Sequence, residues 1–310
     1  MPSALVGLGC LLFFAVAQAV RDAFFGNVFQ SISFFVVAIL AFGGSTVVFG
    51  GWAWLREPKE VRALVNHTRL FVSLNATTAA AWIMYFFALK NVEPAIVNTL
   101  YTGIGSITVL MLSGFGISIA RRADTGWLEL IGHFGVLASL TAIAAVAALG
   151  QSGLGGQPVG IRIAAVVTAV VGGAIIAISH MIARRLGNLG IGSVLLMGLR
   201  FPLTLGIAVA AELALGQAHA RPALEALPLL ALAAFGLIVI PSFFLQLGVA
   251  RTSPLTVNVM RALGPIFVFA AQQFDGRLRF SGATLSCILA FTLFAILTSL
   301  LRGWAEARQS

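Results

Sequence analysis

The sequence predicts an all-α integral membrane protein with ten transmembrane helices arranged as two inverted five-helix repeats. Three observations predict this fold class. Hydrophobic residues make up 59% of the 310 residues and charged residues only 9%, whereas soluble domains contain about 25% charged residues. The apolar residues occur in ten runs, each close to the roughly 20 residues that cross a bilayer. Two segments of the first half recur in the second half at one constant spacing.

The ten apolar runs follow one another with short polar connections. They cover residues 3–20, 31–54, 70–89, 94–117, 130–149, 161–183, 191–212, 228–250, 254–273 and 281–301. Ten spans leave only about 110 residues for loops and tails, which excludes a soluble nucleotide-binding or catalytic domain. Ala17-Gln-Ala19 resembles a signal-peptide cleavage site, but residues 1–20 lack the basic start of a signal peptide, so we expect the first run to be a span.

The formal charge of +9 is explained by topology, because Lys and Arg collect in cytoplasmic loops. With the N-terminus inside, the cytoplasmic basic residues are Arg56, Lys59, Arg62, Arg69, Arg121, Arg122, Arg184, Arg185, Arg251, Arg302 and Arg308. The opposite side carries Arg21, Lys90, Arg162, Arg221, Arg277 and Arg279. This excess places both termini in the cytoplasm. A moderate excess is also what an inverted repeat or a dual-topology ancestor would leave.

An internal repeat appears at a spacing of 160 residues. The motif Pro-x-x-Val-Asn begins at Pro94 and again at Pro254, and the same spacing sets Tyr101 against Arg261. Five helices are an odd number, so the second copy must enter the bilayer upside down, as in many secondary transporters. We therefore expect a first repeat over 1–150, a second repeat over 160–302 and a cytoplasmic tail over 303–310. Two such units can open alternately to opposite sides.

These features resemble a known family. Each fourth helix begins in a short turn, Ala-Leu-Lys-Asn-Val-Glu-Pro-Ala or Gly-Val-Ala-Arg-Thr-Ser-Pro-Leu, and such five-helix units look like the EamA-type repeats of the drug/metabolite transporter superfamily. Over nearly the whole chain, the sequence is most similar to bacterial amino-acid exporters of the YddG type. The resemblance implies a multi-pass protein of the bacterial inner membrane that exports small metabolites, aromatic amino acids included. The lack of room for a nucleotide-binding domain excludes an ATP-driven pump, and we expect the protein to function as a monomer.

The resemblance also indicates where the helices bend. Such repeats often carry a proline midway along the fourth helix. Here Pro265 supplies it in the second half, whereas the first half has Gly105 at the matching position. Pro241 is a second candidate hinge, in the eighth run. Any hinge motion is therefore expected to be asymmetric between the halves.

Polar and aromatic residues form one stripe on the third run and another on the fourth. They are Asn75, Thr78, Trp82 and Tyr85 on the third run and Asn98, Tyr101 and Gly105 on the fourth. At 1.5 Å per residue, Trp82, Asn98 and Tyr101 lie about 6–10 Å below the outer helix ends. Flat rings with polar tips suit a small amphipathic substrate. The alternatives are core packing and an interfacial aromatic belt, for which Tyr85, nearest the surface, is the first candidate.

The second half carries different polar groups. Asn258 and Arg261 lie at the matching depth from the inner face, and Gln246 is a candidate cavity residue. Arg261 either binds a substrate carboxylate or extends to the inner headgroups as an anchor. Arg200 lies deeper and directly precedes Phe201-Pro202. It either attracts a carboxylate or, as we favour, bonds backbone carbonyls that the proline leaves without donors.

All ten acidic residues, Asp22 and Glu93 among them, fall in loops or at the ends of the runs. This placement argues against a mid-membrane carboxylate as a proton relay. His180 then becomes the candidate for proton coupling, with His133 behind it, although a lone His near a helix end is more often a structural group. The histidines are dispersed and both cysteines, Cys10 and Cys287, lie in apolar runs. No metal site, disulfide or cofactor is expected.

Transport is the function class that fits these features. An intramembrane enzyme is a distant alternative, because Ser179 and His180 are adjacent on one helix rather than facing each other. A channel would need a filter motif or a charged ring. The aromatic, Arg-poor interior favours a neutral amino acid or an apolar drug over phosphorylated substrates. Amino-acid export and multidrug or other metabolite efflux stay as the two alternatives, with the substrate and the lipid bilayer as partners and no nucleic acid.

Overall fold

The computed structural model describes residues 2–114, 127–215 and 223–307. Within these ranges the regular secondary structure is helical and no strand occurs. Ten segments are long and apolar enough to cross a membrane. Each corresponds to one of the ten predicted runs, so the prediction of a ten-helix, multi-pass membrane protein is confirmed. Arg121, Arg122, Arg221 and Arg308, which entered the charge comparison, lie outside the described residues.

The helices differ in length and some spans consist of several segments. They are α1 (Pro2–Val28), α2 (Phe34–Ser45), the π-helical turn η1 (Thr46–Gly50), α3 (Gly51–Arg56), α4 (Pro58–Asn66), α5 (Thr68–Asn91), α6 (Pro94–Gly114), α7 (Trp127–Ala148), α8 (Val159–Asn188), α9 (Ser193–Leu199), α10 (Pro202–Leu215), the 3₁₀ turn η2 (Leu224–Ala226), α11 (Leu227–Ala234), the π-helical turn η3 (Phe235–Val239), α12 (Ile240–Arg251), α13 (Pro254–Gln272) and α14 (Gly282–Ala307).

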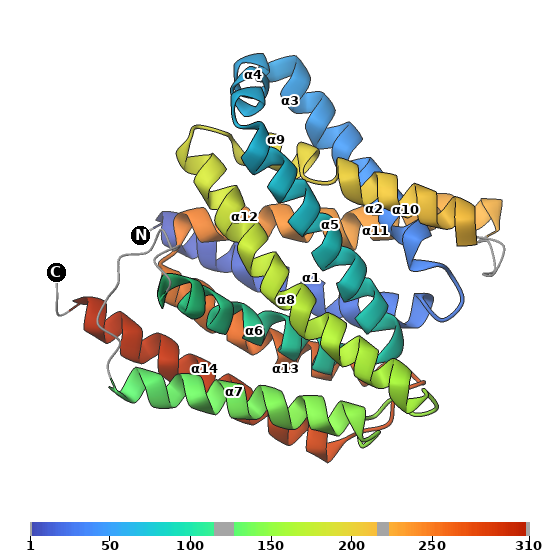
Figure 1. The fold of residues 1–310 in the computed structure, drawn as a ribbon, viewed down its shortest axis with the longest axis vertical. Coiled ribbons are helices and arrows are strands. Elements are labelled where there is room, and N and C mark those ends of the chain that lie inside the picture. Colours follow the sequence, from blue (N-terminus) through green and yellow to red (C-terminus); the bar gives the residue numbers. More distant parts are fainter. Residues whose placement is uncertain (1, 115–126, 216–222, 308–310) are drawn as a thin grey trace.

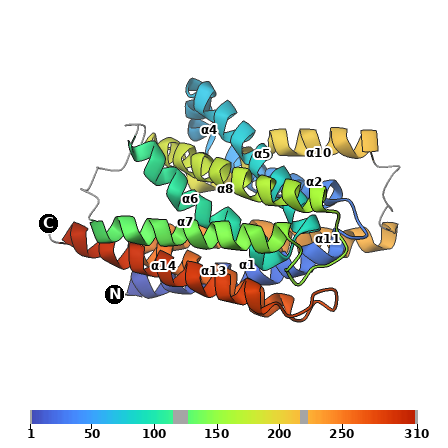
Figure 2. The ribbon, with the colours of Figure 1, turned by 60° about the horizontal axis from the view of Figure 1, so that its bottom comes forward.

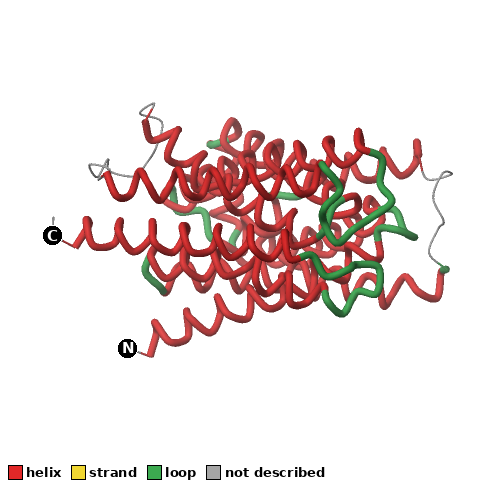
Figure 3. The backbone as a smooth tube through the Cα atoms, turned by 90° about the horizontal axis from the view of Figure 1, so that it is seen from below, coloured by secondary structure: helices red, strands yellow, loops and turns green. Residues whose placement is uncertain are grey.

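The helices form one bundle whose two chain ends lie on the same side (Figure 3). We call this side the terminal face and the opposite side the far face. Helices α7 and α14 lie side by side at one edge (Figures 1 and 2), and α1 packs between α12 and α13. Helix α8 packs against both α5 and α6. The inner surfaces carry a continuous core that is rich in phenylalanine, including Phe25, Phe42 and Phe86.

The first helix is longer than predicted. The prediction ended this span at residue 20, before the charged pair Arg21 and Asp22, but α1 continues to Val28 and the candidate span covers Ala4–Val28. Asp22 therefore lies six residues inside the helix, about 9 Å from its end, and is fully buried. The expectation that every acid falls in a loop or at a span end was wrong, and Arg21 is not a loop residue.

The seventh span is not a single helix. It breaks at Arg200 and Phe201, between α9 and α10, because Pro202 has no N–H and disfavours a helical conformation for the residue before it. The amide of Asn75 on α5 bridges the break. Its Nδ2 donates to the carbonyl of Leu199 at 3.0 Å, and its Oδ1 accepts from the N–H of Leu203 at 3.3 Å. A residue predicted to belong to a binding stripe thus satisfies backbone groups at a helix break.

Two further spans contain irregular turns near glycine or proline. The second span passes through η1, and the eighth passes through η3, which ends two residues before Pro241. Pro265 lies within α13 and is buried, and since it has no N–H, the carbonyl of Arg261 four residues earlier loses its helical donor. The connection after the second span also contains the short helix α4, which was not predicted.

Candidate substrate cavity

A cavity of about 330 Å³ lies between α6, α7, α8, α13 and α14. It extends from Tyr101 on α6 to Glu129, Arg184 and Arg302, which lie near the terminal-face ends of α7, α8 and α14. From the end of α6 to Tyr101 the depth is about 20 Å at 1.5 Å per residue. Ser106 and Arg184 are exposed to solvent on its wall. In the part of the chain that the structure describes, the cavity therefore opens to the terminal face.

Close packing of α8 on α6 positions the deep end of the cavity. Gly173 of α8 lies against the backbone of Tyr101, where a Cβ atom would come within 2.5 Å of the Tyr101 carbonyl oxygen. Only glycine allows this approach without a shift of one helix. The contact fixes the position of the Tyr101 backbone, and the centroid of the Tyr101 ring lies 4.5 Å from that of Tyr85. Gly173 also lines the cavity itself.

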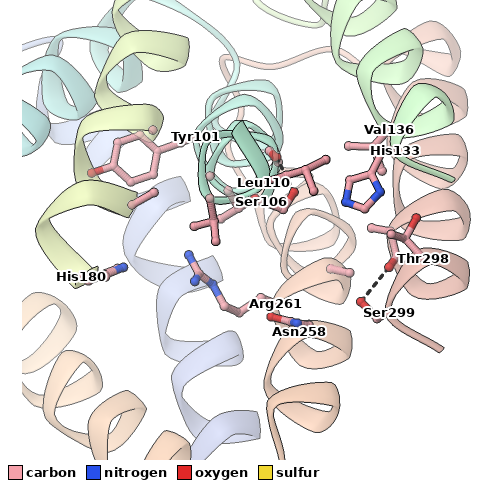
Figure 4. Close-up of a pocket in the computed structure, with 18 of the residues that line it drawn as sticks. Tyr101, Ser106, Leu110, His133, Val136, His180, Asn258, Arg261, Thr298 and Ser299 are labelled. Atoms are coloured by element: carbon pink, nitrogen blue, oxygen red, sulfur yellow. Dashed lines mark hydrogen bonds between the residues drawn. The ribbon is translucent and has the colours of Figure 1, made fainter. Parts of the chain in front are cut away.

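Four of the residues predicted from the sequence meet at this cavity. Tyr101, Asn258 and Arg261, predicted to bind substrate, line it together with His180, the predicted coupling residue. Figure 4 shows that they come from α6, α13 and α8 and surround one space. His133 lines the part that α7 and α14 enclose, and its Nδ1 lies 2.8 Å from the carbonyl oxygen of Glu129.

Three other predicted residues, Trp82, Tyr85 and Asn98, lie behind this cavity in a cluster with Arg21 and Asp22, which we call the α1 charge cluster. The guanidinium of Arg21 donates to Oδ1 of Asp22 at 2.8 Å and to the Tyr85 hydroxyl at 3.1 Å. Nδ2 of Asn98 donates to Oδ2 of Asp22 at 2.9 Å. The guanidinium carbon of Arg21 lies 5.5 Å from the Trp82 ring centroid, within cation–π range.

Burial excludes one of the alternatives considered for these residues. Tyr85 is only 1% exposed and its hydroxyl faces Arg21, so its assignment to an interfacial belt was wrong. Asn98 is fully buried, and its Oδ1 is without a hydrogen-bond partner among the described residues. Trp82, Tyr85 and Asn98 are absent from the cavity lining. Of these three residues, Tyr85 contacts the ring of Tyr101, which does line the cavity.

Sequence reasoning missed the partners of these residues. The signal was the apolar pattern after the pair: Phe24, Phe25, Val28 and Phe29 continue the first run beyond Arg21 and Asp22. Adjacent opposite charges can neutralise each other within a span, so such a pair does not by itself end a helix.

Arg200 forms a second buried polar cluster, at the break between α9 and α10. Its guanidinium lies 3.4 Å from the Thr78 hydroxyl and 3.3 Å from that of Ser179, and those hydroxyls lie 2.8 Å apart. This agrees with a structural role, but the partners are hydroxyls rather than the predicted carbonyls, which Asn75 contacts instead. Gln246 is partly exposed on α12 and is not part of the cavity lining.

At the far face, a hydrogen-bond network is centred on Glu93, in the turn between α5 and α6. The fully buried carboxylate accepts from the N–H of Gly153 at 2.8 Å and from the Thr284 hydroxyl at 3.0 Å. Its other oxygen accepts from the amide of Gln272, whose own Oε1 accepts from the N–H of Ala95 at 2.9 Å. This network connects the start of α6, the end of α13, the start of α14 and the loop after α7.

Burial raises the pKa of Glu93 above its usual value, although the donors from Gly153, Gln272 and Thr284 oppose this rise. Nearby, Asp275 bonds to Arg277 and accepts from Nδ2 of Asn27 on α1 at 3.0 Å. Burial alone would raise the pKa of Asp275, but the hydrogen bonds from Arg277 hold it below its usual value. Both carboxyl groups thus join different helices at the same face.

Within the described residues, no group of three or more His, Cys, Asp or Glu side chains is arranged to hold a metal ion.

The comparisons with known proteins address the fold alone. No known family model and no curated protein matches this chain. One crystal structure, whose description names no function, superposes on all of this chain and on 99% of its own with a TM-score of 0.63 and 19% sequence identity. Such an identity relates the folds and carries no information on substrate or activity.

Proposed function

We propose that the protein is a secondary transporter that exports small metabolites, amino acids and aromatic amino acids among them, across the bacterial inner membrane. The observation that carries this proposal is a cavity that opens to one face and ends at Tyr101, combined with the Glu93 network that joins the helices at the other face. A transporter alternates between such one-sided states. The described residues form membrane-length helices and short connections, without a soluble nucleotide-binding domain. A solute gradient rather than ATP is therefore the proposed driving force.

The two-repeat organisation explains the asymmetry of the cavity. In the proposed inverted repeat, Asn98 and Tyr101 correspond to Asn258 and Arg261. Asn98 is sealed against Asp22, whereas Asn258 is exposed at the cavity. The half nearer the far face would thus be locked while the other half is open. In the expected transport cycle the locked half opens and the open half becomes locked. The EamA-type resemblance leads to the same proposal.

The terminal face is proposed to be cytoplasmic. Without Arg21, which lies inside α1, the basic residues assigned to the opposite side fall to five against eleven, and the positive-inside rule then favours cytoplasmic termini more strongly. The described conformation would be open to the cytoplasm, ready to load a substrate for export.

The test is flux through the full-length protein in liposomes. We expect labelled phenylalanine and leucine to move down their own gradients without a pH gradient, because Asp22 is held in an ion pair and the other described carboxylates lie in connections or near helix ends. Tyr101→Ala should lower the flux at unchanged expression, while the exposed aromatic control Phe134→Ala should keep it. Strict dependence on a pH gradient that disappears in His180→Gln would assign coupling to that histidine.

Each outcome separates the candidate functions. Flux of cationic drugs without flux of amino acids would favour multidrug efflux. Liposomes with the protein that behave like empty liposomes for all these solutes would overturn the transport proposal.

A further inference from the structure

The charges that line the cavity are strongly unequal. The described lining contains three arginines, Arg184, Arg261 and Arg302, and a single acid, Glu129. At 1.5 Å per residue, Glu129 lies about 3 Å from the start of α7, whereas Arg261 lies about 10 Å from the start of α13. The acid is therefore at the terminal end and an arginine is in the deeper part. The deep part carries positive charge without a matching carboxylate.

Arg261 is the group that a ligand would meet there. Its side chain is partly buried and enters the cavity near Tyr101 and Asn258 (Figure 4). The described residues offer it neither a hydrogen bond nor an ion pair. Asp22, in the cluster behind Tyr101, is already bonded to Arg21 and Asn98. A charged side chain inside a span is costly unless it faces a watery cavity or a partner. An anionic ligand would supply that partner.

The surroundings of Arg261 suit a small carboxylate. A guanidinium binds a carboxylate through two parallel N–H···O bonds. The hydroxyl of Tyr101 and the amide of Asn258 add further polar groups, while Ile176 and Phe291 provide apolar wall for an organic body. The cavity volume of about 330 Å³ is at the lower end of the range for small-molecule sites.

The same surroundings disfavour a positive charge. An ammonium group placed beside the carboxylate of a ligand would lie near Arg261, with His180 on the next helix and no acid of the described lining at that depth. We infer that this cavity selects small organic carboxylates that lack an amine, binds them through Arg261, and takes zwitterionic amino acids less well and cations least. The inference rests on the proposed function and narrows its substrate class.

A matched ligand series tests the inference by binding to the purified full-length protein. Phenylalanine, 3-phenylpropionate and phenethylamine share one ring and chain and differ only in their charged groups. We expect 3-phenylpropionate to bind about tenfold or more tightly than phenylalanine in calorimetric titration, and phenethylamine to show the weakest binding. Leucine and 4-methylpentanoate repeat the comparison with an aliphatic body, so the result does not depend on the ring.

Variants of Arg261 then locate the binding group. Arg261→Gln should weaken binding of 3-phenylpropionate about ten- to a hundredfold, because hydrogen bonds to charged groups are lost, and should leave phenethylamine unchanged or improved. Arg261→Lys keeps the charge without the bidentate geometry and should fall between. The control Arg185→Gln removes an exposed arginine near the same helix end as Arg184, outside the lining, and should bind as the wild type does.

The inference is overturned if phenylalanine binds as tightly as 3-phenylpropionate, or if neither 3-phenylpropionate nor 4-methylpentanoate binds. It is also overturned if both Arg261→Gln and Arg261→Lys bind 3-phenylpropionate with the wild-type affinity. These failures are distinct from failure of the proposed function. Amino acids that are transported but bind more tightly than their amine-free analogues would leave transport standing and remove the carboxylate selectivity. Carboxylates that bind but never cross the liposome membrane would leave the site and remove transport.

Discussion

Arg21 and Asp22 place a full positive and a full negative charge inside a membrane-spanning helix. Taking two charges out of water is expensive, and their attraction offsets that cost only with good geometry and further hydrogen bonds. Here the further bonds are present, from Arg21 to Tyr85 and from Asn98 to Asp22. The pair therefore joins α1 to α5 and α6 close to the floor of the cavity.

Removing one member of this pair should be strongly destabilising. Asp22→Asn leaves the Arg21 guanidinium buried without its counter-charge, which costs about 3–5 kcal/mol in buried pairs of other proteins. We expect a large fall of the unfolding temperature in detergent, followed by intrinsic fluorescence. The double variant Arg21→Met/Asp22→Leu, which removes both charges, should unfold at a higher temperature than Asp22→Asn. The exposed control Glu225→Gln should unfold as the wild type does. A fully stable Asp22→Asn would show that the pair contributes little.

Close packing between neighbouring helices positions the polar residues of the bundle. Helix α8 approaches α6 at Gly173. Helix α9 approaches η1 at Gly198, where a Cβ atom would lie 2.2 Å from the backbone nitrogen of Gly50. Asn75 of α5 bridges the break between α9 and α10. Small residues allow such close approach between membrane helices. These contacts place Tyr101 and Arg200 more precisely than the apolar runs alone do.

The contact at Gly173 predicts a sharp effect of one methyl group. Gly173→Ala should force α8 away from the Tyr101 backbone, lower the unfolding temperature by an amount equivalent to about 1–3 kcal/mol and weaken ligand binding in the cavity. The matched control is Gly206→Ala within α10, where a Cβ atom meets nothing within 4 Å. Alanine is the better helix former, so this variant should be as stable as the wild type or slightly more so. Equal behaviour of the two variants would contradict the packing argument.

The sequence was sufficient for the spans and insufficient for their polar contacts. Ten apolar runs predicted ten spans because each must bury its backbone groups within one helix. The charged pair at residues 21 and 22 led to a helix end that was eight residues too early, since a charge was treated as a boundary. The pairing of Asn98 with Asp22, or of Arg200 with Thr78, joins residues that are far apart in the chain. Periodicity places each of them on a helix face but does not specify which faces meet.

The sequence predicted only part of the candidate site. Tyr101, Asn258 and Arg261 were found because the repeat and the polar stripes indicated one interior. Trp82, Tyr85 and Asn98 share the helical faces of cavity residues, but the long side chain of Arg21 from α1 occupies the space in front of them. The sequence shows an apolar pattern that continues past Asp22, but it does not specify which helix faces α1 packs against.

Taken across the bundle, the two faces differ in how they are held. The far face is joined by hydrogen bonds from four segments to Glu93 and Gln272, whereas the terminal face contains the cavity mouth. In the proposed transport cycle the far-face network has to break each time that face opens, so its strength would set how often the face opens.

The state of Glu93 should give this network a defined pH dependence. Its pKa is raised in the folded protein by burial, so the unprotonated form is less favoured in the folded than in the unfolded state. The stability contribution is fully present below the ordinary Glu pKa of about 4.3 and is lost as the pH rises through the raised folded pKa. We expect the unfolding temperature of the wild type, relative to Glu93→Gln, to fall over this window. Glu225→Gln should run parallel to the wild type, and parallel curves for Glu93→Gln would contradict the assignment.

Because the cavity opens to one face, a single cysteine on the cavity wall of α6 should react with a thiol reagent from one side of the membrane only. In a background without the two cysteines of the chain, Cys10 and Cys287, single cysteines are placed at Ser106 and at Thr99, both on α6. Ser106 is exposed on the cavity wall, whereas Thr99 is fully buried nearer the far face. A membrane-impermeant thiol reagent should modify Ser106→Cys in inside-out vesicles, because the terminal face is then outside, and should leave Thr99→Cys unmodified.

In right-side-out vesicles neither cysteine should react quickly as long as the Glu93 network keeps the far face closed. Adding Glu93→Ala removes the acceptor shared by Gly153, Thr284 and Gln272, so in that background the reaction of Ser106→Cys from the far side should speed up while its reaction from the terminal face slows down. Such reciprocity is expected because one population of molecules is divided between two one-sided states. Rapid modification of Ser106→Cys only in right-side-out vesicles of the otherwise unchanged protein would reverse the assigned orientation. Rates unaffected by Glu93→Ala would show that other contacts hold the far face shut.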